Sequence, residues 1–339
     1  DNPLPAICGR ICNRRCEDAC TRGSIDQAIA IDEVKRFIAQ QDLDAETRYI
    51  PKKVVPSLNG SFSEKVAIIG AGPAGLSCAF YLAEKGYSPV IFEKNEKPGG
   101  MLRYGIPSFK LEKDVIDAEI DIIKAMGVEI KCGIEVGKDV TLDELRAQGY
   151  KAFYIAIGCQ GGRKAGIPGE NAEGVMTAVD FLRTVGADES YPVTGKAVVV
   201  GGGNVAIDVA RISSRCTDHN VSMFCLEQRE EMPASKEEIA EALGEGIRLN
   251  PGWGMKEILE EEGHVCGVVF KRCVRVFNDE GRFSPEYDEN DTVTVDCRHV
   301  IFSVGQTADW GGILEGTNVK LRPNGSAMAN KLTYQTGEP

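Results

Sequence analysis

Four cysteines near the start of the chain have a type and a spacing that could hold a metal centre. Cys8, Cys12, Cys16 and Cys20 follow one another at intervals of four residues. Residues four apart lie on one face of an α-helix, so these thiols would form a stripe. Four thiolates held close together need a cation or an iron–sulfur cluster to offset their mutual repulsion. The spacing matches neither a common zinc motif nor a common cluster motif, and of the two it favours an iron–sulfur cluster.

A glycine-rich turn that could bind a dinucleotide phosphate lies at 70–75, with the sequence GAGPAG. It follows an apolar strand predicted over 66–69 and precedes a helix predicted over 76–85. The glycines of such a turn permit the bend, the close approach of a pyrophosphate and the packing of the helix on the strand. The helix N-terminus adds free N–H groups and a partial positive charge. A second strand, over 89–92, ends at Glu93, whose carboxylate is expected to bind a ribose.

The same layout recurs at 201–206, where the sequence is GGGNVA. A strand over 197–200 precedes this turn, a helix over 206–214 follows it, and a strand over 221–225 leads to Glu227. The pattern GxGxxA is an accepted variant of the dinucleotide-binding turn. Two such sites in one chain imply hydride transfer between NAD(P)H and FAD. The cofactors carry that chemistry, so no catalytic side chain is required.

The elements around these turns predict an α/β fold with internal duplication. The apolar strand over 153–158 resembles the one over 300–305, so each nucleotide unit is closed by a similar strand. Residues 264–299 alternate apolar and polar side chains, as antiparallel strands do. Before the first turn, residues 26–41 have the apolar spacing of a helix, and residues 42–63 are typical of a linker.

The composition of the 339 residues excludes several classes of protein. Apolar residues make up 42% and charged residues 27%, as in soluble globular proteins. The 39 basic and 51 acidic residues give a net charge of -12, which argues against nucleic-acid binding. There is no apolar run of about 20 residues that would span a membrane and no secretion signal, so we expect a cytoplasmic protein. The lack of a CxxC pair argues against a disulfide reductase of the thioredoxin reductase type.

Several segments carry a resemblance to a known family, and they are NPLPAICGRICNRRCEDAC, VAIIGAGPAGLSCAFYLAEKG, EKPGGMLRYGIPSFKLEKDVI, VVVGGGNVAIDVAR and EEMPAS. In this order they resemble the small (beta) subunit of glutamate synthase and its relatives, including the electron-entry half of dihydropyrimidine dehydrogenase. The resemblance implies a small helical iron–sulfur domain, then an FAD-binding Rossmann-like domain with an inserted NAD(P)-binding Rossmann-like domain. It also implies that electrons pass from NAD(P)H to FAD and on through 4Fe-4S clusters to a larger redox partner subunit or domain.

The resemblance also implies which residues contact the cofactors. For FAD these are Gly70, Gly72, Pro73, Ala74, Gly75, Glu93, Lys94, Gly100, Met101, Lys110, Val136 and Gly158. For NAD(P)H they are Gly201, Gly203, Asn204, Val205, Ala206, Glu227 and Arg229, with Val304 and Gly305 near the cofactors. The metal ligands are Cys8, Cys12, Cys16 and Cys20.

Three departures from the family pattern bear on these expectations. The family's clusters draw on two four-cysteine groups, and only the second is present, so we expect a fragment with an incomplete ligand set. The family's Gly-Asp motif at the FAD site would follow TYQTGEP, where the chain stops. NADPH-using relatives carry two arginines where this chain has Leu226 and Glu227. An acid suits the ribose 2′-OH and repels a 2′-phosphate, so NADH is favoured, while nearby Arg229 leaves NADPH open.

The expected domains are a partial iron–sulfur domain over 1–45, a linker over 46–63, an FAD domain over 64–162 and 299–339, and an NAD(P)H domain over 163–298. The C-terminal part of the FAD domain is expected to be incomplete. The alternative to an electron-transfer enzyme is a non-catalytic nucleotide-binding or scaffold component of a larger redox complex. That alternative would bind nucleotide without reduction of a flavin.

Overall fold

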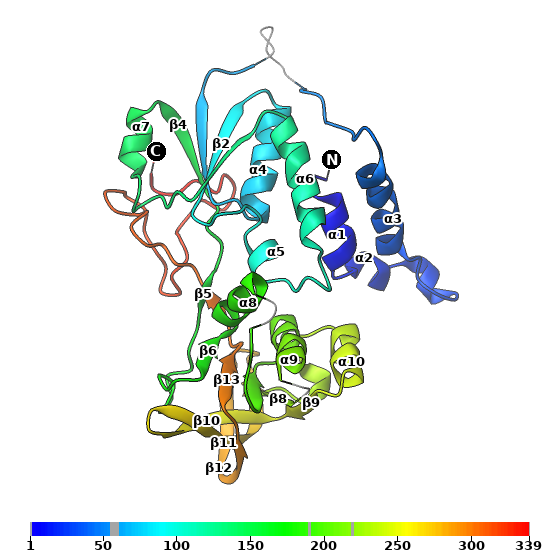
Figure 1. Ribbon diagram of the computed structural model, residues 1–339, viewed down its shortest axis with the longest axis vertical. Coiled ribbons are helices and arrows are strands. Elements are labelled where there is room, and N and C mark those ends of the chain that lie inside the picture. The colour runs from blue at the N-terminus through cyan, green and yellow to red at the C-terminus, as the bar shows by residue number, and fades with distance from the viewer. Residues whose placement is uncertain (1, 55–60, 189–190, 218–219, 339) are drawn as a thin grey trace. The chain divides into compact units, whose positions relative to one another are not determined.

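The computed structural model describes residues 2–54, 61–188, 191–217 and 220–338 (Figure 1). The chain divides into two compact units, of which the first comprises Asp1–Gln160 and Ala308–Pro339, and the second Gly161–Thr307. Each unit contains one parallel sheet with a glycine turn after its central strand. Among the described residues, no helix combines the length and the hydrophobicity that a bilayer crossing requires.

The first unit is built on a four-stranded parallel sheet in the order β3-β2-β1-β4. The strands are β1 (Lys65–Ile69), β2 (Ser88–Glu93), β3 (Glu129–Cys132) and β4 (Tyr150–Ile155). The helices are α4 (Pro73–Glu84), α5 (Met101–Tyr104), α6 (Lys113–Ala125) and α7 (Leu142–Ala147). Because side chains alternate along a strand, Ile68 packs toward α4 and α6 while Ile69 packs toward α7 and the C-terminal segment.

The N-terminal segment packs against α6 within this first unit (Figure 1). It contains α1 (Pro5–Ile11), α2 (Arg15–Asp18), the 3₁₀ turn η1 (Thr21–Ser24) and α3 (Ile31–Asp44). The helix predicted over 26–41 therefore exists but begins later. The prediction that one helix carries all four cysteines on one face is wrong. Arg14 adopts a left-handed conformation with φ 54° and separates α1 from α2.

The second unit has a five-stranded parallel sheet in the order β6-β13-β7-β8-β9. The strands are β6 (Val175–Thr177), β13 (His299–Phe302), β7 (Ala197–Val200), β8 (Val221–Cys225) and β9 (Arg248–Pro251). One face of this sheet packs on α8 (Ala178–Ala187), α9 (Asn204–Cys216) and α10 (Lys236–Gly244). A short antiparallel pair, β5 (Gly161–Gly162) and β14 (Gln306–Thr307), lies at the two ends of the unit's chain segment.

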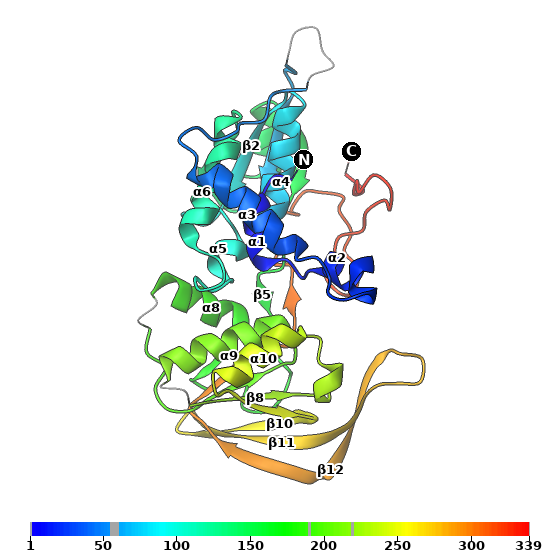
Figure 2. The same ribbon diagram turned by 90° about the vertical axis from the view of Figure 1, so that its right-hand side faces the viewer.

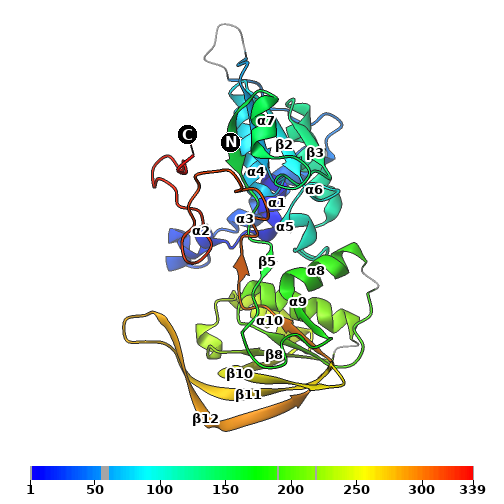
Figure 3. The same ribbon diagram turned by 90° about the vertical axis from the view of Figure 1, so that its left-hand side faces the viewer.

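An antiparallel sheet covers the other face of that parallel sheet (Figure 2). Its strands are β10 (Trp253–Glu261), β11 (His264–Phe277) and β12 (Phe283–Asp296), in that order (Figure 3). Phe270 of β11 stacks on Phe224 of β8, with ring centroids 4.0 Å apart. The antiparallel strands predicted over 264–299 are therefore present, and they bury the parallel sheet from the side opposite the helices.

The expected domain boundary at 299 differs from the structure. Strand β13 pairs in parallel with β7 and with β6, so it completes the sheet of the second unit. Its side chains Val300, Ile301 and Phe302 are at most 2% exposed there, and this burial fixes the strand in that sheet. The chain returns to the first unit only at Ala308.

Candidate functional site

A cavity of about 410 Å³ lies at the carboxyl ends of β1 and β2 in the first unit. Gly70 has φ +106°, and a Cβ there would come within 2.5 Å of the Ala156 carbonyl oxygen, so the sharp bend after β1 requires glycine. The turn directs the N-terminus of α4 to the cavity. The predicted FAD residues that line it are Gly70, Gly72, Pro73, Ala74, Glu93, Lys94, Gly100, Met101, Val136 and Gly158.

The space beside Gly72 suits a dinucleotide phosphate. Among the described residues, a Cβ on Gly72 would meet only the Gly100 Cα, at 3.8 Å, so the backbone is open to a close ligand. Gly75 differs, because a Cβ there would lie 1.9 Å from the Gly70 carbonyl oxygen. Its role is to let α4 pack on the turn. Neither Gly75 nor the predicted contact Lys110 lines the cavity.

Glu93 is 3% exposed and is held at the glycine turn by three donors. Its Oε2 accepts from the Ala71 N–H at 2.7 Å, and its Oε1 accepts from the backbone and side-chain amides of Asn95 at 2.9 and 2.6 Å. These bonds fix a carboxylate beside the turn, where a ribose hydroxyl could reach it. The same edge is shaped by Arg103, whose Nε donates to the Pro98 carbonyl at 2.7 Å and steadies the loop that carries Gly100.

The C-terminal segment adds cavity residues that sequence reasoning missed. Trp310 and Ile313 line the cavity, and Trp310 Nε1 donates to the Gly325 carbonyl at 2.8 Å. A Cβ on Gly312 would lie 2.2 Å from the Gly137 carbonyl oxygen, so the two backbones meet directly. The Gly311–Gly312 pair was the available signal for this close approach.

A separate cavity of about 240 Å³ lies at the second glycine turn, within the second unit. Beyond Gly203 itself and its two chain neighbours, no heavy atom of the described residues lies within 4 Å of a Cβ built on Gly203, which leaves the turn open to a ligand. The predicted NAD(P)H residues that line this cavity are Gly203, Asn204, Val205 and Gly305. Its lining does not include Gly201, Ala206, Glu227, Arg229 or Val304.

Glu227 nevertheless lies beside this turn. Its Oε2 is 2.7 Å from the position that a Cβ on Gly202 would occupy. Arg229 is exposed and belongs to the 3₁₀ turn η2 (Arg229–Glu231). The group that the structure brings to the glycine turn is therefore the acid.

The four cysteines do not converge in this structure. Cys8 is in α1, Cys12 ends it, Cys16 is in α2 and Cys20 precedes η1. Within the described parts of the chain, no three His, Cys, Asp or Glu side chains gather as a metal site requires. Hydrogen bonds from the backbone at Ile29 and Arg22 lower the pKa of the Cys20 thiol, which suits a ligating thiolate. The donor chemistry fits a cluster, but the arrangement is not a complete ligand set.

Comparison with known proteins matches two parts of the chain to two protein families. Residues 64–337 match the family described as pyridine nucleotide-disulphide oxidoreductase. Residues 1–47 match the 4Fe-4S cluster domain II of dihydropyrimidine dehydrogenase. The fold is similar to that of Mycobacterium tuberculosis FprA in complex with NADPH, with a TM-score of 0.60 and 20% identity over 72% of this chain and 71% of that chain.

Two relatives illustrate the range of similar proteins. The chain is 39% identical to the NAD-dependent dihydropyrimidine dehydrogenase subunit PreT of Salmonella typhimurium, covering 100% of this chain and 75% of the relative. It is 37% identical to the small chain of the Escherichia coli NADPH glutamate synthase, covering 73% of this chain and 54% of the relative. The chain spans about half the length of several other curated relatives that it matches. The chain belongs to the pyridine nucleotide-disulphide oxidoreductase family, in the group that includes the glutamate synthase small chain, and carries a 4Fe-4S domain segment ahead of that region.

Proposed function

We propose that the chain is an oxidoreductase module that takes electrons from NAD(P)H into FAD and delivers them through 4Fe-4S clusters to a larger redox partner. The observation that carries the proposal is the pair of glycine turns, one open to a ligand at Gly72 and the other at Gly203, each facing its own cavity. One such turn would suit a simple dehydrogenase, whereas two suit transfer between two dinucleotides. FAD, when bound, supplies the hydride acceptor.

The residues of this chain would bind and orient the two cofactors. At the first turn, the open backbone at Gly72 and the N-terminus of α4 suit a pyrophosphate, and Glu93 suits the adjoining ribose. At the second turn, Gly203 and the N-terminus of α9 suit the pyrophosphate of NAD(P)H. The cysteines of residues 1–47 would supply part of the ligand set of the clusters.

We further propose that the nucleotide is NADH. The carboxylate of Glu227 beside Gly202 could accept the ribose 2′-OH and would repel a 2′-phosphate. The relatives use both nucleotides, as the names NAD-dependent dihydropyrimidine dehydrogenase and NADPH glutamate synthase indicate. The carboxylate at Gly202 therefore supports this choice more directly than the comparisons do.

The test is anaerobic titration of the FAD-loaded chain with each nucleotide while flavin absorbance is followed. We expect NADH to bleach the flavin at a concentration at least about tenfold below that of NADPH, since the charged 2′-phosphate must approach Glu227. Glu227→Gln removes that charge and is expected to bring the two concentrations together. Glu230→Gln, an exposed acid in the same loop, should leave the ratio unchanged.

Two other outcomes of the titration would count against parts of this proposal. If NADPH bleaches the flavin at the lower concentration, the NADH preference is wrong and the class of enzyme stands. If nucleotide binds and the flavin never bleaches, the chain behaves as the non-catalytic scaffold.

A further inference from the structure

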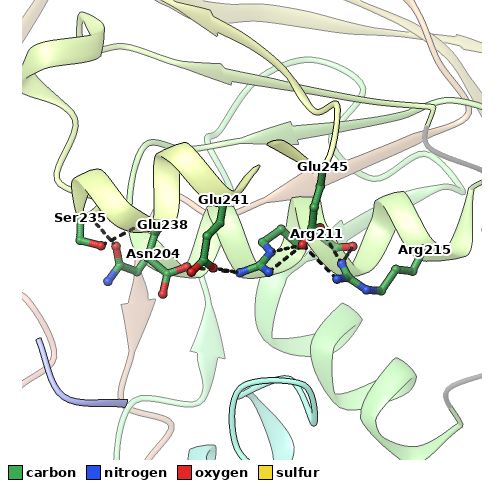
Figure 4. Close-up of polar contacts among 7 residues, drawn as sticks. All are labelled: Asn204, Arg211, Arg215, Ser235, Glu238, Glu241 and Glu245. Carbon is green, nitrogen blue, oxygen red and sulfur yellow. Dashed lines mark hydrogen bonds and ion pairs between the residues drawn. The ribbon is translucent and has the colours of Figure 1, made fainter. Parts of the chain in front are cut away.

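The loop at 226–235, which carries Glu227 from β8 to α10, is fastened to the second glycine turn. The Ala234 N–H donates to the Gly202 carbonyl at 3.1 Å. The Ser235 N–H donates to the side-chain Oδ1 of Asn204 at 2.8 Å (Figure 4). The family resemblance predicted Asn204 as a nucleotide contact, yet its side-chain oxygen is directed to this loop. Both ends of the loop therefore meet the turn, since Glu227 lies against Gly202.

A polar seam extends these contacts along the helices α9 and α10. Arg211 lies seven residues after Asn204, so the two residues share a face of α9. The side chain of Arg211 is only 9% exposed, and its Nε and one terminal nitrogen donate to Glu245 Oε1 at 2.9 and 2.6 Å. The α9–α10 seam consists of Asn204, Arg211, Arg215, Ser235, Glu238, Glu241 and Glu245 (Figure 4).

The charges in the seam hold it together near neutral pH. Burial alone would raise the pKa of Glu245, but hydrogen bonds from Arg215 and Arg211 outweigh burial and lower this pKa to about 2. Glu245 is therefore ionised at neutral pH and holds both guanidinium groups. This end of the seam ties α10 to α9, and the Asn204–Ser235 contact ties the start of α10 to the glycine turn.

We propose that the α9–α10 seam determines nucleotide discrimination by holding the 226–235 loop, with Asn204 and Ser235 as positioning residues for Glu227. This inference rests on the proposed function. A carboxylate discriminates between a hydroxyl and a phosphate only while it stays close, because charge repulsion falls as the separation grows. A loosened loop lets the carboxylate move away from an incoming 2′-phosphate. The seam would therefore act on the NADH-to-NADPH ratio more than on hydride transfer itself.

A matched pair of variants at Ser235 isolates the contact. Ser235 has φ -65°, the value that proline prefers, so Ser235→Pro fits the local backbone at this residue while removing its N–H. Ser235→Ala keeps the N–H and removes only the hydroxyl that caps α10 through the Glu238 N–H at 3.3 Å. We expect Ser235→Pro to reduce the NADH-to-NADPH ratio of kcat/KM at least about fivefold relative to Ser235→Ala, chiefly through KM, with kcat for NADH unchanged.

The Arg211→Gln variant tests the far end of the same seam. Arg211 does not line the nucleotide cavity. A fall in the NADH-to-NADPH ratio of kcat/KM in Arg211→Gln would therefore show that the seam acts through the loop. The Arg211→Gln variant also provides a test of the proposal if Ser235→Pro does not fold. Equal ratios in Ser235→Pro and Ser235→Ala, or an unchanged ratio in Arg211→Gln when Ser235→Pro is unfolded, would overturn the proposal.

Hydrogen exchange separates this proposal from the proposed function. If the wild-type chain has no nucleotide preference, or if its flavin is not bleached, that part of the proposed function is wrong. Hydrogen exchange then tests separately whether the seam holds the 226–235 loop. Peptides covering 229–235 should exchange faster in Ser235→Pro than in Ser235→Ala. Equal exchange in that case means that the seam does not hold the loop.

Discussion

Gly203→Ala is expected to leave the chain loaded with FAD and unable to take electrons from NADH at ordinary concentrations. Gly203 has φ -93° and ψ 173°, a conformation that alanine adopts without strain. Apart from Gly203 and its two chain neighbours, no described atom lies within 4 Å of the added methyl, so the fold should be unaffected. The methyl instead occupies the space through which a pyrophosphate approaches the turn. We expect the NADH concentration for half-bleaching to rise about 100-fold, since displacements near 1 Å have effects of this size.

Gly72→Ala is the matched control for that prediction. Gly72 also has an ordinary conformation, with φ -76° and ψ -177°, and only the Gly100 Cα lies near its added methyl. This variant should lose FAD while still binding NADH, the reverse of Gly203→Ala. Bound FAD is measured by absorbance, NADH binding by calorimetry, and dithionite shows whether the flavin of Gly203→Ala remains reducible. Normal bleaching of Gly203→Ala by NADH would contradict the assignment of the second turn.

The glycine turns could be predicted from sequence because their determinants are local. Each turn lies within about ten residues of the strand before it and the helix after it. In the first turn, Gly70 makes the sharp bend and is in direct contact with Gly75. The sheet to which β13 belongs could not be predicted from such local patterns. The similar segments over 153–158 and 300–305 overlap β4 and β13, and each of these strands pairs with the strand that leads into a glycine turn. That similarity identifies the kind of strand and says nothing about which sheet receives it.

The contacts that hold these sites together were also beyond the sequence patterns. The bonds from Ser235 to Asn204 and from Ala6 to Glu119 join residues 31 and 113 positions apart. Helical periodicity predicted one face for the four cysteines, whereas the left-handed Arg14 divides them between two short helices. Periodicity describes each element alone, so it cannot predict the junctions or the partners of buried polar groups.

Glu119→Ala is expected to release α1, and with it Cys8, from the first unit. Glu119 is a 1% exposed residue of α6, and its two oxygens accept from the Ala6 and Ile7 N–H groups at 2.6 and 3.0 Å. These N–H groups begin α1 and have no partner inside the helix. Without the carboxyl group, two buried donors lose their acceptor, which costs about 2–6 kcal/mol. Hydrogen exchange of the α1 amides measures this loss as a fall in the free energy of local opening.

The same carboxyl group makes the docking of α1 depend on pH. Burial raises the pKa of Glu119 from 4.5 to about 7, although the two N–H donors oppose this shift. When α1 is docked the group holds its proton up to about pH 7, whereas the opened state ionises near 4.5. The contribution of Glu119 to the free energy that docks α1 is therefore largest below pH 4.5 and falls as pH rises to about 7. We expect a decrease of about 2–3 kcal/mol across this window.

Glu119→Gln and Glu112→Gln distinguish this effect from a general loss of surface charge. Glutamine cannot ionise, so Glu119→Gln should abolish the pH dependence while weakening one of the two bonds to α1. Glu112 accepts from Arg10 of α1 at 2.7 Å but is 48% exposed, so Glu112→Gln should change the opening free energy by less than about 1 kcal/mol. If α1 in the wild-type chain instead keeps the same protection from pH 5 to 7, Glu119 is ionised both when α1 is docked and when it is open. The helix would then be held by a buried charge, and Glu119→Gln would weaken it at both ends of this pH range.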